Sequence, residues 1–147
     1  MVNSICNEMY SKLPNLVLGF HGCHKDVFDS VVKGGQHLKR SENEYDWLGN
    51  GIYFWENSPE RALDWAKSRY KDEACVVGAV IEQIHKYYKL NNFETYDSIR
   101  GIFTEGKEVY PGSGFVEKTH VQLCIVNPNC IKGYFAPMPY NSEYRIP

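Results

Sequence analysis

Leu18-Gly-Phe-His-Gly-Cys23 is the stretch that decides the fold, together with Asp46-Trp-Leu-Gly-Asn-Gly-Ile-Tyr-Phe-Trp55. Each segment sets a polar side chain, His21 or Tyr53, beside glycine in an apolar run of the kind that predicts a buried strand. Glycine beside a strand allows a flat ligand to approach the backbone. A histidine and a tyrosine facing each other across such a cleft can hydrogen-bond a ribose and stack on a ring. The alternative is two core strands whose polar side chains are satisfied locally.

Length and composition favour one domain, residues 1–147, with a substantial core. The chain has 147 residues, of which 43% are hydrophobic and 14% aromatic. The formal net charge is -2, and both signs are interspersed along the chain without a basic block. Composition therefore does not suggest nucleic-acid binding.

The five cysteines include no Cys-x-x-Cys pair, which favours a reducing, cytoplasmic compartment. Cys23 and His24 lie beside His21, but no second Cys/His pair has matching spacing, so we expect no metal. The apolar run over 16–20 is too short for a signal peptide, and the longest apolar stretch, 75–81, is far short of a membrane span. We therefore expect no membrane partner.

Hydrophobic patterning predicts an α+β class with more strands than helices. Ser58 and Pro59 predict a helix start, and Gly34-Gly35 predicts a helix end. Residues 91–118 carry few regular signals, and their glycines and Pro111 predict a loop over 107–115. We expect strands over 16–21, 52–55, 75–84, 119–126 and 132–136. We expect a helix over 26–33, with Val27, Phe28, Val31 and Val32 on one face, and a second over 58–70 that buries Ala62, Leu63, Trp65 and Ala66.

His21-Gly22, followed by Gly49-Asn-Gly-Ile-Tyr-Phe54, resembles the ADP-ribosyltransferase superfamily of the diphtheria-toxin and poly-ADP-ribose-polymerase type. Proteins of that branch carry a histidine, a tyrosine and usually a glutamate on three strands. The likeness spans residues 16–136 and extends to small uncharacterised bacterial proteins. It implies a split antiparallel β-sheet core with an NAD cleft and few helices.

The resemblance also implies roles for individual residues. In the family, the histidine hydrogen-bonds the adenosine ribose, the next glycine holds the nicotinamide amide through its backbone, and the tyrosine stacks on the nicotinamide ring. The resemblance implies that His21, Gly22 and Tyr53 take these roles here. Ser41 and Tyr45, just before the second motif, are further candidates for NAD contact.

The third role, the glutamate near the nicotinamide ribose, has three candidates. Glu117 is the carboxylate at the entrance of the expected late strand, and His120 and Gln122 follow on one face of it. A histidine or glutamine there keeps a hydrogen bond to a ribose hydroxyl but supplies no fixed negative charge. Glu105 is a remaining alternative, and Arg100 is either a pyrophosphate contact or a surface arginine.

These features predict an enzyme that transfers a single ADP-ribose unit from NAD to an unidentified protein or nucleic-acid acceptor and releases nicotinamide. The family's arginine-specific members carry other motifs where this chain has His21 and Tyr53, so an arginine target is not favoured. One alternative is a non-catalytic module that binds NAD or ADP-ribose, and another is an RNA 2'-phosphotransferase-like enzyme. A toxin role is compatible with the resemblance, and the oligomeric state is left open.

Overall fold

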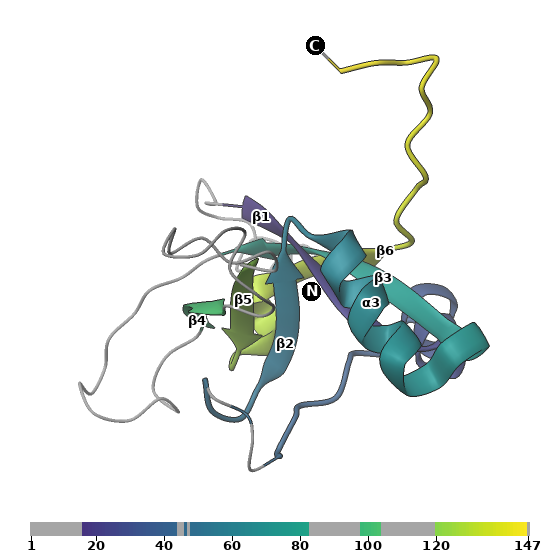
Figure 1. The fold of residues 1–147 in the computed structure, drawn as a ribbon. Coiled ribbons are helices and arrows are strands. Elements are labelled where there is room, and N and C mark those ends of the chain that lie inside the picture. The colour runs from purple at the N-terminus through teal and green to yellow at the C-terminus, as the bar shows by residue number, and fades with distance from the viewer. Residues whose placement is uncertain (1–15, 44–45, 47, 83–97, 104–119, 147) are drawn as a thin grey trace, which may run out of the picture.

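Six antiparallel strands form one sheet in the order β4-β5-β2-β1-β3-β6 (Figure 1). The computed structural model describes residues 16–43, 46, 48–82, 98–103 and 120–146. The strands are β1 (Leu16–His24), β2 (Ile52–Glu56), β3 (Ala74–Glu82), β4 (Ser98–Phe103), β5 (His120–Ile125) and β6 (Ile131–Phe135).

Two α-helices lie among the described residues, α2 (Lys25–Phe28) and α3 (Pro59–Tyr70). α2 continues into a π-helical turn, Asp29–Lys33, and short 3-10 turns follow at Lys71–Glu73 and Pro128–Cys130. α3 packs against β1 and β3 (Figure 1). The fold is therefore α+β, as the sequence predicts.

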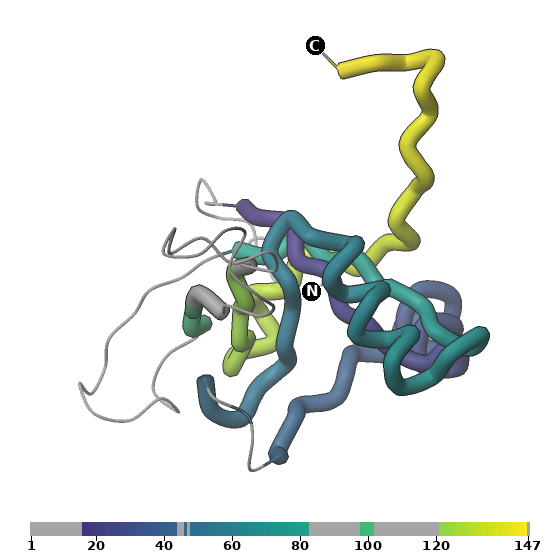
Figure 2. Tube along the Cα trace, in the orientation of Figure 1, coloured from purple at the N-terminus to yellow at the C-terminus, as the bar shows by residue number. Residues whose placement is uncertain are grey.

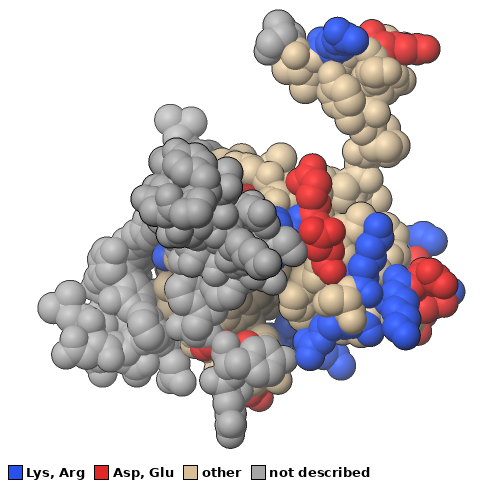
Figure 3. Space-filling model, viewed as in Figure 1, with Lys and Arg blue, Asp and Glu red and all other residues tan. Residues whose placement is uncertain are grey.

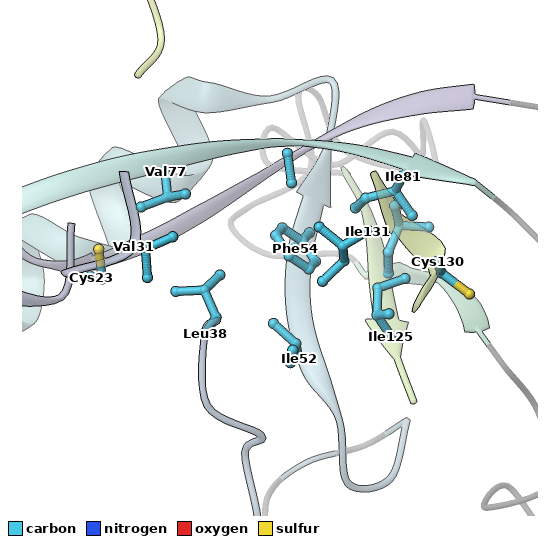
Figure 4. Close-up of a cluster of buried hydrophobic side chains, with 12 residues drawn as sticks. Cys23, Val31, Leu38, Ile52, Phe54, Val77, Ile81, Ile125, Cys130 and Ile131 are labelled. Carbon is cyan, nitrogen blue, oxygen red and sulfur yellow. The ribbon is translucent and has the colours of Figure 1, made fainter. Parts of the chain in front are cut away.

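The sheet has apolar side chains on both faces because alternate residues of each strand point to opposite sides. On one face, Phe54, Ile52 and Leu123 belong to the larger core. Its labelled members extend from Cys23, Val31 and Leu38 at one end to Ile81, Ile125 and Cys130 at the other (Figure 4). On the other face, Phe20 and Trp55 pack with Ala62 of α3. The central strands β1 and β2 contribute to both cores.

Close packing of α3 on the sheet depends on Gly22. A Cβ at this position would lie 2.3 Å from the carbonyl oxygen of Ala62 and 3.1 Å from the Cβ of Ala66. Both alanines are fully buried, as the sequence predicts. The helix backbone therefore fills the space that a side chain at residue 22 would need.

Most of the expected elements are confirmed within the described residues, and the bounds differ at the ends. β1 runs three residues further than expected, to His24, because it pairs with β3 along its whole length. α3 begins at Pro59 after Ser58, although the Ser58 side chain makes no capping hydrogen bond. Val27, expected on one apolar helix face with Val31, is 39% exposed and lies two residues before the π-helical turn that begins at Asp29, whereas Val31 within that turn is buried.

The sequence does not predict β4, since residues 91–118 carry few regular signals. Arg100 and Gly101 interrupt the apolar pattern of this strand. β4 forms because it pairs with β5 over its full length, from Ser98 opposite Ile125 to Phe103 opposite His120. This long-range pairing leaves no local signal in the sequence.

Charges of both signs are interspersed on the face shown in Figure 3, where basic side chains gather next to acidic ones around the helical side of the molecule. After β6, the chain leaves the body as an extended segment with exposed Met138 and Tyr140 (Figure 2). No helix within the described residues is long and apolar enough to cross a membrane.

Candidate functional site

The two motifs meet at a short junction between β1 and β2. The two strands pair through Gly19 with Glu56 and through Phe20 with Trp55. The amide of Asn57 donates to the carbonyl of Leu18 at 2.9 Å, so the backbone polar groups of even-numbered β1 residues face β2. By this alternation, Phe20 and Trp55 form the following hydrogen-bonded pair. In an uninterrupted ladder the pair after that would join Gly22 to Tyr53.

A side chain takes the place of that pair. The Nδ1 of His21 lies 2.7 Å from the carbonyl oxygen of Tyr53. A carbonyl only accepts, so Nδ1 carries the proton and donates it. The imidazole therefore makes the last hydrogen bond between β1 and β2 at this end of the ladder. The backbone N–H and C=O of Gly22 face the same junction, by the alternation along β1.

The protonation state of His21 follows from its surroundings. Its side chain is half-buried and packs edge-on against Phe54, with the ring centroids 5.9 Å apart. Desolvation lowers the pKa of His21, and the hydrogen bond to the Tyr53 carbonyl offsets only part of this effect. At neutral pH the ring is thus uncharged, with the proton on Nδ1 and a lone pair on Nε2. This nitrogen is suited to accept a hydrogen bond from a hydroxyl.

Tyr53 uses its hydroxyl within the protein. The hydroxyl accepts from the amide of Leu48 at 2.9 Å and donates to the carbonyl of Gly49 at 2.7 Å. Burial raises the pKa of Tyr53, so the phenol stays protonated. The half-buried ring, rather than the hydroxyl, is the part of Tyr53 suited to a ligand.

His21 and Tyr53 do not face each other as side chains. Tyr53 alternates along β2 with Phe54, and the His21 ring lies against Phe54. The two side chains therefore leave the sheet on opposite faces, and their contact runs from the His21 ring to the Tyr53 backbone. A ligand that touches both rings has to pass the junction itself, beside Gly22.

Among the three candidates for the third role, Gln122 is the one whose side chain the structure describes. Gln122 is half-buried and pairs with Trp55 of β2 on one side and Gly101 of β4 on the other. Cross-strand partners share a face, and Trp55 shares its face with Tyr53. Gln122 thus lies on the same face as the Tyr53 ring, on the neighbouring strand.

The structure does not describe the side chains of the remaining candidates. The backbone of His120 begins β5 opposite Phe103, but its side chain lies outside the described part of the structure. Glu117, Glu105 and Tyr45 also lie outside the described residues, as does the loop expected over 107–115.

Ser41 is brought next to the second motif by backbone contacts. Its amide donates to the carbonyl of Gly51 at 2.7 Å, and the Gly51 amide donates back at 3.3 Å. Its hydroxyl donates to Asp46 Oδ2 at 2.7 Å, and the same carboxylate oxygen accepts from the amide of Asn43 at 2.7 Å. Ser41 thus has a structural role, because it links Gly51 to Asp46. Its contact with NAD remains a prediction.

Arg100 forms an ion pair with Glu56, whose side chain is only 8% exposed. A neighbouring carboxylate reduces the attraction of this arginine for a second anion. The pairing favours the structural interpretation of Arg100 over the pyrophosphate contact.

Within the described ranges, no group of three or more His, Cys, Asp or Glu side chains is placed to hold a metal ion. Comparisons with protein-family models, with curated proteins and with solved structures find no match to this chain. The resemblance to the ADP-ribosyltransferase superfamily therefore rests on the two sequence motifs.

Proposed function

We propose that the chain binds NAD across the junction of β1 and β2 and transfers one ADP-ribose unit to a macromolecular acceptor. The observation that carries this proposal is the His21–Tyr53 contact, which joins the two motifs at one point of the sheet. A neutral Nε2 suits a ribose hydroxyl, the Tyr53 ring suits a nicotinamide ring, and the Gly22 backbone suits a carboxamide. The finer fold assignment, an ADP-ribosyltransferase-like domain with an NAD cleft, is part of the same proposal.

The reaction breaks the bond between nicotinamide and C1' of its ribose. Nicotinamide leaves with the bonding electrons as a neutral molecule, and the acceptor nucleophile bonds to C1' and loses its proton. Because the transition state has oxocarbenium character, the protein assists by holding the leaving carboxamide and by stabilising positive charge on the ribose. In this proposal Gly22 and Tyr53 hold nicotinamide, and a group on or before β5 supports the ribose.

Gln122 favours single transfer over polymer formation. Its amide can hydrogen-bond a ribose hydroxyl, but it supplies no negative charge. The same observation favours a second candidate function, a module that binds NAD or ADP-ribose without cleaving it. Catalysis then depends on whether Glu117 supplies the charge instead.

Thermal unfolding with and without NAD tests the binding step. At a hundredfold excess over its Kd, NAD should stabilise the folded protein by about 2.7 kcal/mol. His21→Ala and Tyr53→Ala should each reduce this gain, whereas His37→Ala, which removes an exposed histidine bonded to Tyr134, should keep it. Equal stabilisation of all variants that fold would contradict the assignment.

Incubation with labelled NAD and separate pools of proteins, RNA and 2'-phosphorylated RNA tests the chemistry. Nicotinamide release with label on one pool supports transfer to that class of acceptor. Removal of the 2'-phosphate would indicate the phosphotransferase reaction instead. NAD binding without nicotinamide release in any pool would favour the binding module.

A further inference from the structure

We propose that the hydroxyl of Tyr53, assisted by the thiol of Cys124, fixes the turn formed by Leu48, Gly49, Asn50 and Gly51 as one wall of the NAD site. This proposal rests on the proposed function and adds a second task for Tyr53. Its ring would contact NAD, and its hydroxyl would act as a positioning group that orders the wall. We call residues 48–51 the 48–51 turn.

Three hydrogen bonds link the 48–51 turn to the side chains of Tyr53 and Cys124. The Tyr53 hydroxyl accepts from the amide of Leu48 at 2.9 Å and donates to the carbonyl of Gly49 at 2.7 Å. The buried thiol of Cys124, opposite Tyr53 in the register of β2 and β5, donates to the same Gly49 carbonyl at 3.7 Å. One phenol thus satisfies both a donor and an acceptor of two successive backbone units, which a ring alone cannot do.

The two glycines of the motif fit this arrangement. Gly49 has a φ of 88°, a conformation that glycine adopts without strain. A Cβ on Gly51 would lie 2.5 Å from Cys124 Sγ and 2.9 Å from the carbonyl oxygen of Ile125. The backbone conformation therefore favours glycine at residue 49, and the close approach to β5 requires it at residue 51, independently of any ligand.

The 48–51 turn in turn orders the residues before it. The amide of Gly49 donates to the Asp46 carbonyl at 3.0 Å, and Gly51 exchanges backbone hydrogen bonds with Ser41. The Arg40 guanidinium donates to the Asn50 carbonyl at 3.4 Å. Contacts therefore continue from the Tyr53 hydroxyl to Ser41, one of the residues predicted to meet NAD.

Removing only the hydroxyl separates the two tasks of Tyr53. Tyr53→Phe keeps a ring for stacking but leaves the Leu48 amide and the Gly49 carbonyl without the phenol. Backbone groups that lose such a partner favour opening of the segment toward water. The NAD site would then have to be ordered on binding, which weakens affinity.

The matched control is Tyr134→Phe. The Tyr134 hydroxyl also accepts a hydrogen bond from a backbone amide, since the Leu38 amide donates to it at 3.4 Å. The same hydroxyl lies 3.0 Å from the Nδ1 of His37. It lies on β6, at the far edge of the sheet from β5. Both substitutions remove one oxygen from a half-buried tyrosine that anchors a neighbouring segment.

Hydrogen exchange of the ligand-free protein and NAD titration together decide the proposal. Tyr53→Phe should speed amide exchange in the peptide that contains the 48–51 turn and weaken NAD binding about tenfold, the order expected for one lost anchor. Tyr134→Phe should speed exchange around residue 38 and leave NAD affinity unchanged. Unchanged exchange in the 48–51 turn of Tyr53→Phe, or faster exchange with parental NAD affinity, would overturn the proposal.

The two proposals fail separately. A parent protein that does not bind NAD refutes the proposed function, while hydrogen exchange still decides whether the hydroxyl orders the turn. For Cys124, serine keeps a donor toward Gly49 and alanine does not. Exchange in the 48–51 turn should therefore stay near the parent's rate in Cys124→Ser and rise in Cys124→Ala, and equal rates in both variants would overturn the role of the thiol.

Discussion

His21 Nδ1 donates to the backbone carbonyl of Tyr53 over 2.7 Å, so the two motifs are joined by a side chain that bonds to a main chain. This bond explains how a histidine is accommodated in an apolar strand, because one nitrogen is satisfied inside the sheet. It also fixes the neutral tautomer, in which Nε2 remains an acceptor. The local, structural interpretation of His21 and the ligand-binding one thus apply to different nitrogens of the same ring.

The stability of the protein should depend on the protonation of His21. Burial lowers its pKa below the ordinary value of 6.5, so the folded state binds this proton less readily than the unfolded state. The contribution of His21 to the free energy of unfolding should be complete above pH 6.5 and should decline as the pH falls through the folded-state pKa. Urea unfolding between about pH 5 and pH 8 measures this decline.

His21→Asn is the control for this prediction, since an amide can donate to the Tyr53 carbonyl but does not titrate in this range. The decline below pH 6.5 should be smaller in this variant than in the parent. If the parent and His21→Asn lose stability in parallel, other groups cause the pH dependence.

Gly22→Ala should destabilise the fold through α3. The added methyl group would lie 2.3 Å from the Ala62 carbonyl oxygen, and a helix backbone cannot move away as a side-chain tip can. Overpacking of this kind costs about 1–3 kcal/mol in the free energy of unfolding. Gly133→Ala on β6 is the matched strand control, because a Cβ there meets nothing within 4 Å. Denaturant unfolding should separate the two variants, and equal stability would mean that α3 is not seated on Gly22.

Arg100→Met should affect folding more than NAD binding. The substitution removes the cation beside Glu56, a carboxylate that is 8% exposed, and a carboxylate deprived of its cation destabilises the folded state by about 1–3 kcal/mol. NAD affinity should change by less than about twofold, since this arginine is already paired. An affinity loss of tenfold or more, measured by calorimetry and partly restored in Arg100→Lys, would instead support the pyrophosphate contact.

The sequence predicts the parts of the fold that have local signals. Pro59 marks the start of α3, Gly34-Gly35 marks the end of the first helical segment, and apolar runs mark β1 and β3. β4 has no such signal, because Gly101 and Arg100 break its pattern and its stability comes from pairing with β5. Helix ends and apolar strands can therefore be predicted from neighbouring residues, whereas the pairing of distant segments cannot.

In the candidate site, too, the residue types can be predicted from the sequence, but the contacts between distant residues cannot. The type and spacing of His21 and Tyr53 single them out, but the sequence does not reveal that the Tyr53 hydroxyl is engaged by Leu48 and Gly49. Nor does it reveal that Gly22 is needed by α3, because that contact depends on a helix forty residues downstream. The sequence predicts that the glycines admit a ligand, and the described contacts give Gly22 and Gly51 a packing role within the protein.

Gln122→Glu tests which residue fills the third role. Gln122 lies on the Tyr53 face of the strand next to β2, so a carboxylate at this position would place negative charge on the side of the sheet where the proposal puts the nicotinamide ribose. Glutamate and glutamine have nearly the same size, so the change adds charge with little change of shape. Loss or gain of one well-placed electrostatic stabiliser changes a rate by about 10²–10³.

If the amide of Gln122 limits turnover, Gln122→Glu should accelerate nicotinamide release on this order, with NAD affinity nearly unchanged. Glu117→Gln is the reciprocal variant and should then have little effect. The opposite result, slow release in Glu117→Gln and parental release in Gln122→Glu, would assign the role to Glu117. A binding module predicts a third pattern, in which NAD binds to all three proteins and none of them releases nicotinamide. Nicotinamide release followed over time, with affinities from calorimetry, separates the three because only an electrostatic stabiliser of the transition state changes the rate without changing the binding.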